Sequence, residues 1–193
     1  MSGREVDIRT PDGVGDAYLA RPDDGPHPGV LFIMDAYGLR PTINEMVDRI
    51  AADGAAYLDY LAAAGATEPF AITGYCMGAR IGWRIAAAHP DRVAALGGFH
   101  AGGLVTDAAD SPHRSAADVK AELYFGFADN DPSMTAEQIA ALTSALDDAG
   151  ARYRAEVYEG AAHGYTMSDT AAFDEAASER HFRELGALLD RTF

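Results

Sequence analysis

The stretch T-G-Y-C-M-G-A-R, residues 73–80, holds the only cysteine of the chain, Cys76. It follows the strand-like run F-A-I-T and precedes the helix-like run A-R-I-G-W-R-I-A-A-A. A G-x-C-x-G pattern at a strand-to-helix turn is typical of a nucleophile elbow, which projects its nucleophile above the carboxyl end of a sheet. The N-terminus of the following helix favours a thiolate there. The alternative interpretation is a small buried cysteine in a glycine-rich turn.

A nucleophile at such an elbow needs a histidine to move protons and an acid to orient that histidine, in the chain order nucleophile, acid, histidine. Asp129 follows the strand-like run E-L-Y-F-G-F-A, and His163 follows the strand-like run R-Y-R-A-E-V-Y. We therefore predict that Cys76, Asp129 and His163 are the catalytic residues. Asp131 is the alternative acid, although the D-P-S-M that begins with it is typical of the approach to a helix.

The other histidines are weaker candidates for a catalytic role. His100 follows the strand-like run V-A-A-L-G-G-F, so it is either a residue that lines the pocket at the same edge or an ordinary loop residue. We expect a structural or solvated position for His89 and surface positions for His27, His113 and His181.

Strand-like and helix-like runs alternate along the chain, which predicts an α/β fold with a mostly parallel twisted sheet and helices on both faces. The expected strands are residues 30–34, 70–73, 93–99, 121–127 and 152–158, and the expected helices are residues 42–52, 55–64, 79–88, 135–149 and 173–190. An antiparallel hairpin is expected at residues 6–9 and 14–20. Residues 101–120 show no periodicity, and long loops of this kind often border functional sites. We expect one domain, residues 1–193.

These motifs together resemble the dienelactone hydrolase family of the α/β-hydrolase fold. The resemblance rests on G-Y-C-M-G, F-A-D-N-D, E-G-A-A-H-G-Y and the run V-L-F-I-M-D-A-Y-G-L. It implies a carboxylic-ester hydrolase that cleaves an ester or enol lactone through a thioester acyl-enzyme, with Cys76, Asp129 and His163 as the triad. It also implies an oxyanion hole formed by the backbone N–H groups of Met77 and Ala36. Such chemistry needs no metal and no organic cofactor.

Two positions depart from what the resemblance implies for the named activity. Asp35 stands where the family has a glutamate that helps to control the ionisation of the cysteine. Met167 stands where the family has an arginine that binds the substrate carboxylate. The substrate therefore need not be dienelactone. The expected substrate-binding or auxiliary residues are Asp35, Tyr37, His100 and Tyr165.

The resemblance is interrupted once, near residues 49–59. The family has a strand of the type Y-V-V-L-x-P-D and a long excursion there, where this chain reads R-I-A-A-D-G-A-A-Y-L-D. We expect that a segment of the family is missing from the chain at this place.

The composition argues against several classes of partner. The net charge of −15 disfavours nucleic acids and anionic membranes, because an acidic surface repels phosphates. The N-terminal residues M-S-G-R-E-V-D lack an apolar signal core, and one cysteine cannot form an internal disulfide, so we expect a cytoplasmic protein. The expected partner is a small ester or lactone, bound by a monomer or small homo-oligomer. Rival hypotheses are a non-catalytic binding protein and a single-cysteine redox protein.

Overall fold

The structure is a computed structural model that describes residues 2–11, 13–21, 28–33 and 58–193. Residues 58–63 are helical, at the start of the last of these ranges. The other elements, in chain order, are β1 (Ser2–Thr10), β2 (Gly13–Arg21), β3 (Pro28–Ile33), β4 (Thr67–Tyr75), α2 (Met77–Ala88), β5 (Val93–Phe99), the 3₁₀ helix η1 (Pro112–Asp118), β6 (Glu122–Ala128), α3 (Ala136–Asp148), β7 (Tyr153–Tyr158) and α4 (Glu175–Thr192).

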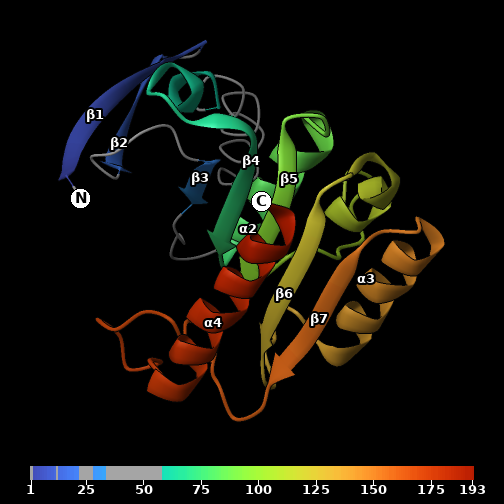
Figure 1. The fold of residues 1–193 in the computed structure, drawn as a ribbon. Helices are drawn as coiled ribbons and strands as arrows, with labels where there is room; N and C mark the ends of the chain where they lie inside the picture. Colours follow the sequence, from blue (N-terminus) through green and yellow to red (C-terminus); the bar gives the residue numbers. More distant parts are fainter. Residues whose placement is uncertain (1, 12, 22–27, 34–57) are drawn as a thin grey trace.

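Within the described residues the main sheet has five strands, all of them parallel, in the order β3-β4-β5-β6-β7. The strands β1 and β2 form a separate antiparallel hairpin, which lies beyond β3 in Figure 1. Parallel neighbours need crossover connections, and α2 supplies the one from β4 to β5 while α3 supplies the one from β6 to β7. The predicted fold class, an α/β fold with an N-terminal hairpin, is therefore confirmed.

Both faces of the main sheet are covered, as the continuous apolar runs of its strands predict. Alternate residues of β6 enter two different cores. Leu123, Phe125 and Phe127 pack in the core that contains α2, whereas Tyr124 and Ala128 pack in the core under α4. Figure 1 shows α4 in front of the sheet and α2 behind it. The carboxyl edge of the sheet is thus held rigidly between two helical layers.

Local sequence signals explain several element boundaries. The strand predicted at residues 93–99 is β5, and α3 begins at the predicted capping box. There Thr135 Oγ1 accepts a hydrogen bond from Gln138 N (3.3 Å), while the Gln138 side chain accepts one from Thr135 N (2.8 Å). The helix expected at residues 42–52 lies outside the described residues. The segment expected to be a loop, residues 101–120, contains η1, with Pro112 and Ala116 buried.

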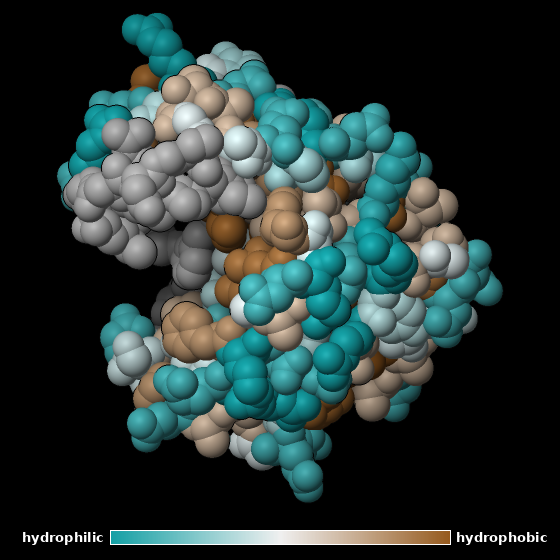
Figure 2. Space-filling view, in the orientation of Figure 1, coloured by the Kyte–Doolittle hydropathy of each residue, from teal (hydrophilic) through white to brown (hydrophobic). Residues whose placement is uncertain are grey.

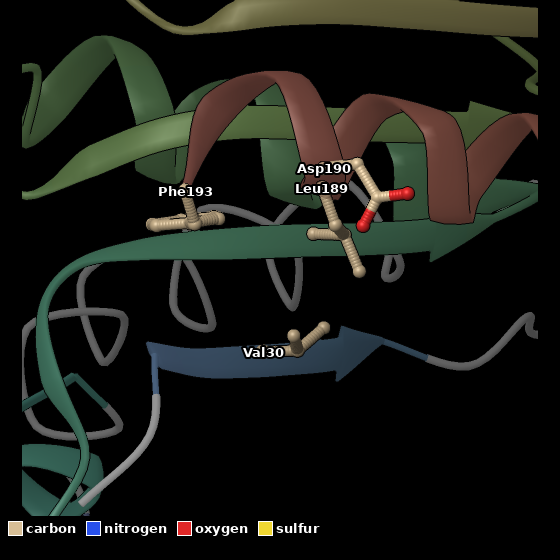
Figure 3. Close-up of a pocket in the computed structure, with 4 residues that line it drawn as sticks. All are labelled: Val30, Leu189, Asp190 and Phe193. Carbon is tan, nitrogen blue, oxygen red and sulfur yellow. The ribbon is translucent and has the colours of Figure 1, made fainter.

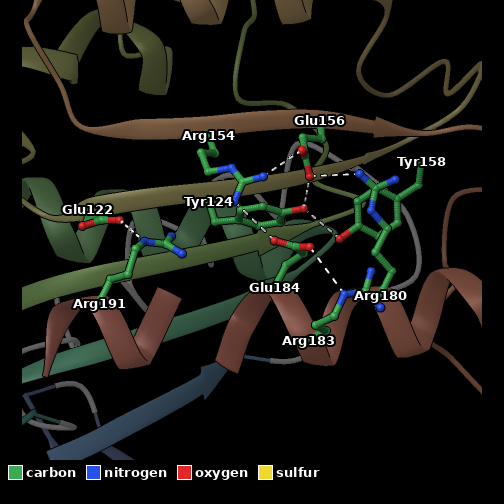
Figure 4. Close-up of polar contacts among 9 residues, drawn as sticks. All are labelled: Glu122, Tyr124, Arg154, Glu156, Tyr158, Arg180, Arg183, Glu184 and Arg191. Atoms are coloured by element: carbon green, nitrogen blue, oxygen red, sulfur yellow. Dashed lines mark hydrogen bonds and ion pairs between the residues drawn. The ribbon is translucent and has the colours of Figure 1, made fainter. Parts of the chain in front are cut away.

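A cluster of polar side chains holds α4 against β6 and β7 (Figure 4). Tyr124 is fully buried, and its hydroxyl donates a hydrogen bond to Glu156 Oε2 (2.7 Å). Arg180 of α4 donates to the same oxygen (3.0 Å), and its guanidinium lies 4.2 Å from the ring centroid of Tyr158. These contacts, made on β6, β7 and α4, fix the position of the helix along the sheet.

The end of α4 and β3, the outermost strand of the main sheet among the described residues, border an open pocket of about 300 Å³ (Figure 3). Val30, Leu189, Asp190 and Phe193 line it. Figure 2 shows a largely hydrophilic surface over α4 on this face of the molecule. None of the helices in the described part of the chain has the length and apolar character needed to cross a membrane.

Candidate active site

Cys76 occupies a sharp turn between β4 and α2, as the elbow pattern predicts. It is the N-cap residue of α2, with φ 54° and ψ −118°. Residues other than glycine rarely adopt this backbone conformation. Cys76 N donates a hydrogen bond to Phe99 O (3.1 Å), which holds the turn against β5. A Cβ at Gly74 would collide with the backbone carbonyl of Gly78. The first glycine of the pattern is therefore required by the close approach of β4 to α2.

His163 lies in the loop after β7, with its imidazole beside the acid loop that follows β6. Its Nδ1 is 2.5 Å from Asp131 Oδ2. Burial alone would raise the pKa of Asp131, but hydrogen bonds from His163 and Ser133 outweigh burial and lower it. Asp131 is therefore ionised where it contacts His163. Because its side chain is buried, water does not compete for this contact.

Asp129, the acid predicted from the sequence, does not contact His163. Its Oδ2 instead accepts a hydrogen bond from Gly160 N (3.0 Å), and its own N–H donates to Ala161 O (2.8 Å). The reason for the difference is the residue between the two acids. Asn130 has φ 52°, a left-handed conformation that turns the chain and aims Asp131, two residues later, at the histidine. The prediction that Asp129 orients His163 is therefore corrected to Asp131.

The pKa of His163 reflects both Asp131 and Cys76. The hydrogen bond with Asp131, followed by a hydrogen bond with Cys76, raises the pKa of His163 to about 10 although partial burial opposes the shift. With Nδ1 bonded to Asp131, Nε2 is the nitrogen available to Cys76. The negative charge of a Cys76 thiolate contributes to the same shift. The His163 ring is therefore protonated at neutral pH.

This charge state predicts how the stability of the protein depends on pH. The pKa of His163 is raised from its ordinary value of 6.5 to about 10 in the folded protein. The stabilisation from the protonated ring is therefore fully present below pH 6.5 and is lost as pH rises through 10. We expect the free energy of unfolding of the wild type to fall by about 1–3 kcal/mol more than that of His163→Gln across this range, since partial exposure weakens the ion pair. Urea unfolding at pH 6 and pH 10 measures the difference, and parallel pH dependences of the two proteins would contradict it.

His100 and Tyr165, both predicted as substrate-binding or auxiliary residues, lie behind His163 and have no exposed surface. The rings of His100 and His163 have their centroids 5.2 Å apart, and those of His100 and Tyr165 are 5.1 Å apart. Burial and the nearby His163 lower the pKa of His100 to about 3, so its ring stays neutral. His100 Nε2 lies 2.8 Å from Thr166 Oγ1, and Tyr165 donates to Gly126 O (3.0 Å). This placement fits an auxiliary role, not direct contact with a substrate.

The remaining predicted site residues are only partly described. Met77 is the first residue of α2, so its N–H has no acceptor within the helix and is available to an oxyanion. Met167 packs at the margin of the core under α4. Asp35, Ala36 and Tyr37 lie outside the described residues, and their predicted roles stay predictions.

One buried histidine was predicted wrongly. His181 of α4, expected at the surface, is 2% exposed, and its Nδ1 lies 3.0 Å from the carbonyl oxygen of Ser178. Since a carbonyl only accepts, Nδ1 is the donor and Nε2 accepts the hydroxyl of Tyr75 (2.8 Å). Tyr75 immediately precedes Cys76, so this hydrogen bond ties the elbow to the helix on the other face of the sheet. Tyr75 and His181 are 106 residues apart, and no local sequence signal marks such a contact.

Comparison with known proteins places this site in a family. Residues 53–193 match the model of the "Dienelactone hydrolase family". A Salmonella typhi protein named "Putative carboxymethylenebutenolidase" is 26% identical, with 89% of this chain and 86% of the relative covered. An Escherichia coli protein of the same name is 25% identical, with 84% and 77% covered. The Salmonella alignment spans 234 positions against the 193 residues of this chain, so the relative has residues without a counterpart here. The predicted position of a missing segment, near residues 49–59, stays a prediction.

Solved structures share the fold. The crystal structure titled "Putative Dienelactone Hydrolase" from Klebsiella pneumoniae superposes with a TM-score of 0.85 at 20% identity and covers 97% of each chain. A dienelactone hydrolase-like phosphotriesterase from metagenomic libraries superposes with a TM-score of 0.79 at 18% identity, with 100% of this chain and 98% of the other covered. The match to the family model extends over most of the chain. The chain therefore belongs to the dienelactone hydrolase family and is a hydrolase with the α/β-hydrolase fold.

Proposed function

We propose that this protein hydrolyses a carboxylic ester or enol lactone through a thioester on Cys76, with His163 as acid and base and Asp131 as the residue that orients His163. The single observation that carries the proposal is the position of His163, whose Nδ1 lies 2.5 Å from Asp131 Oδ2 and whose pKa is raised by both Asp131 and Cys76. A cysteine at an elbow, a histidine and an acid bonded to that histidine are the groups that nucleophilic catalysis needs.

The first half of the reaction forms the thioester. The Cys76 thiolate attacks the carbonyl carbon, a C–S bond forms, and the carbonyl π electrons move to oxygen. That oxyanion is stabilised by the N–H of Met77 at the start of α2 and by a second N–H, assigned by the family resemblance to Ala36. The C–O bond to the alcohol or enol then breaks, and the imidazolium of His163 gives its proton to the departing oxygen.

The second half releases the acid. Once Cys76 is acylated, its negative charge no longer raises the pKa of His163, and the neutral ring can act as a base. His163 takes a proton from a water molecule as the water attacks the thioester, and Asp131 stabilises the imidazolium that forms. Collapse of this second tetrahedral intermediate expels the Cys76 thiolate and restores the starting pair.

The chemistry of sulfur limits the substrate class. A thiolate is readily expelled from a tetrahedral intermediate, so an alkoxide or enolate must compete with it as the leaving group. The enolate of an enol ester or enol lactone is a good leaving group, especially when its oxygen is protonated. The amine of an amide is a poor leaving group. The curated relatives carry the name carboxymethylenebutenolidase, which denotes an enol-lactone hydrolase, and we extend that substrate class to this chain.

Trapping of the acyl-enzyme tests the proposal. The protein is mixed with p-nitrophenyl acetate, quenched in acid within the first turnovers and analysed by intact mass spectrometry and peptide mapping. We expect a mass increase of one acetyl group, located on the peptide that contains Cys76, because thioester formation precedes hydrolysis. The Cys76→Ala protein should show no acetylation under the same conditions. Acetylation that persists at other residues in Cys76→Ala, together with unchanged turnover, would overturn the proposal, because the reaction would then use another nucleophile. Absence of turnover in the wild type would favour a binding or redox role.

A further inference from the structure

A serine in the acid loop contacts both partners of the proposed proton-transfer pair. Ser133 follows Asp131 by two residues, and its Oγ lies 2.5 Å from Asp131 Oδ1 and 3.1 Å from His163 Nδ1. Its backbone N–H also donates to Asp131 Oδ1 (2.8 Å). One oxygen of the carboxylate is thus bonded twice by the same residue, while the other oxygen is bonded by the histidine.

We propose that Ser133 is a positioning residue that sets the orientation of the Asp131 carboxylate and of the His163 ring. This inference rests on the proposed function, because it concerns a residue that acts on the acid and the base of that reaction.

The hydrogen positions define what Ser133 does at each contact. A hydroxyl has one hydrogen, and at 2.5 Å that hydrogen is donated to Asp131 Oδ1. Toward His163 Nδ1 the same oxygen can then only accept. The N–H of His163 therefore lies between two acceptors, Asp131 Oδ2 and Ser133 Oγ. One acceptor would fix the position of Nδ1, whereas two acceptors in different directions also fix the plane of the ring.

The carboxylate gains a comparable constraint. Two donors from Ser133 hold Oδ1, so Oδ2 must point to His163, and the carboxylate cannot rotate to offer another lone pair. The same hydrogen bonds help to lower the pKa of Asp131 against its burial, which keeps the group ionised beside the histidine.

Ser133 also joins the acid loop to the elbow through its backbone. Its carbonyl accepts a hydrogen bond from Gly103 N (3.1 Å), and the adjacent Gly102 N lies 3.5 Å from Cys76 O. A Cβ at position 102 would lie 3.1 Å from Ser133 Oγ, so the absence of a side chain on Gly102 leaves room for the hydroxyl. The serine therefore lies where the loops that carry the nucleophile, the acid and the base meet.

A double-mutant cycle tests this role. Ser133→Ala is expected to lower kcat for p-nitrophenyl acetate about tenfold with little change in KM, the effect of removing one hydrogen bond to a charged group. In an Asp131→Ala background the same substitution should lower kcat less than about twofold, because no carboxylate remains to be oriented. Equal effects in the two backgrounds would overturn the proposal, since they would show that Ser133 only supports the loop. If Asp131→Ala itself leaves kcat unchanged, the proposed function fails instead.

Two further measurements separate positioning from loss of structure. Ser111→Ala is the matched control, because Ser111 Oγ also contacts the Nδ1 of a histidine, His113 (2.9 Å), away from the site, and it accepts a hydrogen bond from Thr106 N (2.8 Å). We expect it to leave kcat per folded molecule unchanged. The ¹H NMR signal of the His163 Nδ1–H proton reports on the contact between His163 and Ser133 and does not depend on a measurement of activity. We expect this proton to exchange faster with water in Ser133→Ala, and an unchanged signal would contradict a role at the ring.

Discussion

Replacement of Cys76 by alanine should reduce kcat/KM for p-nitrophenyl acetate by about 10⁴–10⁶-fold, the loss found when the nucleophile of a triad is removed. The reason is that the carbon–sulfur bond of the proposed intermediate cannot form. Initial rates at pH 7 with the two purified proteins measure the effect. Alanine keeps the Cβ and hence the backbone conformation of the turn, where Cys76 has φ 54°, so we expect the fold to persist.

Cys76→Ser is the informative companion. A serine hydroxyl cannot be the resting anion beside His163, so the histidine would have to remove its proton during the attack. We therefore expect Cys76→Ser to hydrolyse the ester more slowly than the wild type but faster than Cys76→Ala. Far-UV circular dichroism serves as the control for folding. Residual activity in Cys76→Ala above about a tenth of the wild-type rate would show that the reaction does not pass through Sγ.

The second large effect concerns two aspartates of the same loop. Asp131→Ala should lower kcat by about 10³–10⁴-fold, since the acid that orients the base carries an effect of this size in other triads. Asp129→Ala should lower kcat no more than about threefold, because Asp129 bonds to the backbone of Gly160 and not to His163. Steady-state kinetics of both variants on p-nitrophenyl acetate give the comparison.

Asp129→Ala is the control for Asp131→Ala, because the two substitutions are of the same type and lie two residues apart in one loop. Asp129→Ala should instead lower the free energy of unfolding by about 1 kcal/mol, through the loss of a hydrogen bond between the loops after β6 and β7. A larger loss of kcat in Asp129→Ala than in Asp131→Ala would reverse the assignment that the structure supports.

The parts of the site that the sequence predicted depend on residues close together in the chain. The elbow was predictable because its glycine spacing, the preceding strand and the following helix all lie within a few residues of Cys76. The position of His163 was predictable because it follows a strand of the sheet. The sequence favoured Asp129 as the acid, whereas the structure brings Asp131 to His163. The left-handed turn at Asn130, between the two aspartates, is a feature that the sequence pattern did not reveal. An asparagine between two aspartates, with a serine two residues after the second, is the signal that could have indicated Asp131.

Contacts between residues far apart in the chain could not be predicted from the sequence. The amphipathic pattern predicted the last helix, but not that His181 turns inward to accept the hydroxyl of Tyr75. The order of strands in the sheet was also open, because buried parallel strands have similar apolar runs and their pairing depends on the whole fold. His100 illustrates the same limit, since its place after a strand did not reveal that it lies behind the base rather than at the surface.

The all-parallel sheet has a consequence for how the protein acquires activity as it folds. Cys76, Asp131 and His163 follow β4, β6 and β7, which lie with β5 in one sheet. The helix α2 joins β4 to β5, and α3 joins β6 to β7. Parallel pairing of this kind depends on contacts between distant parts of the chain, which form slowly. No partly folded fragment that lacks β7 could hold the base beside the nucleophile. Return of esterase activity during refolding would therefore report completion of the sheet, later than the return of helical signal.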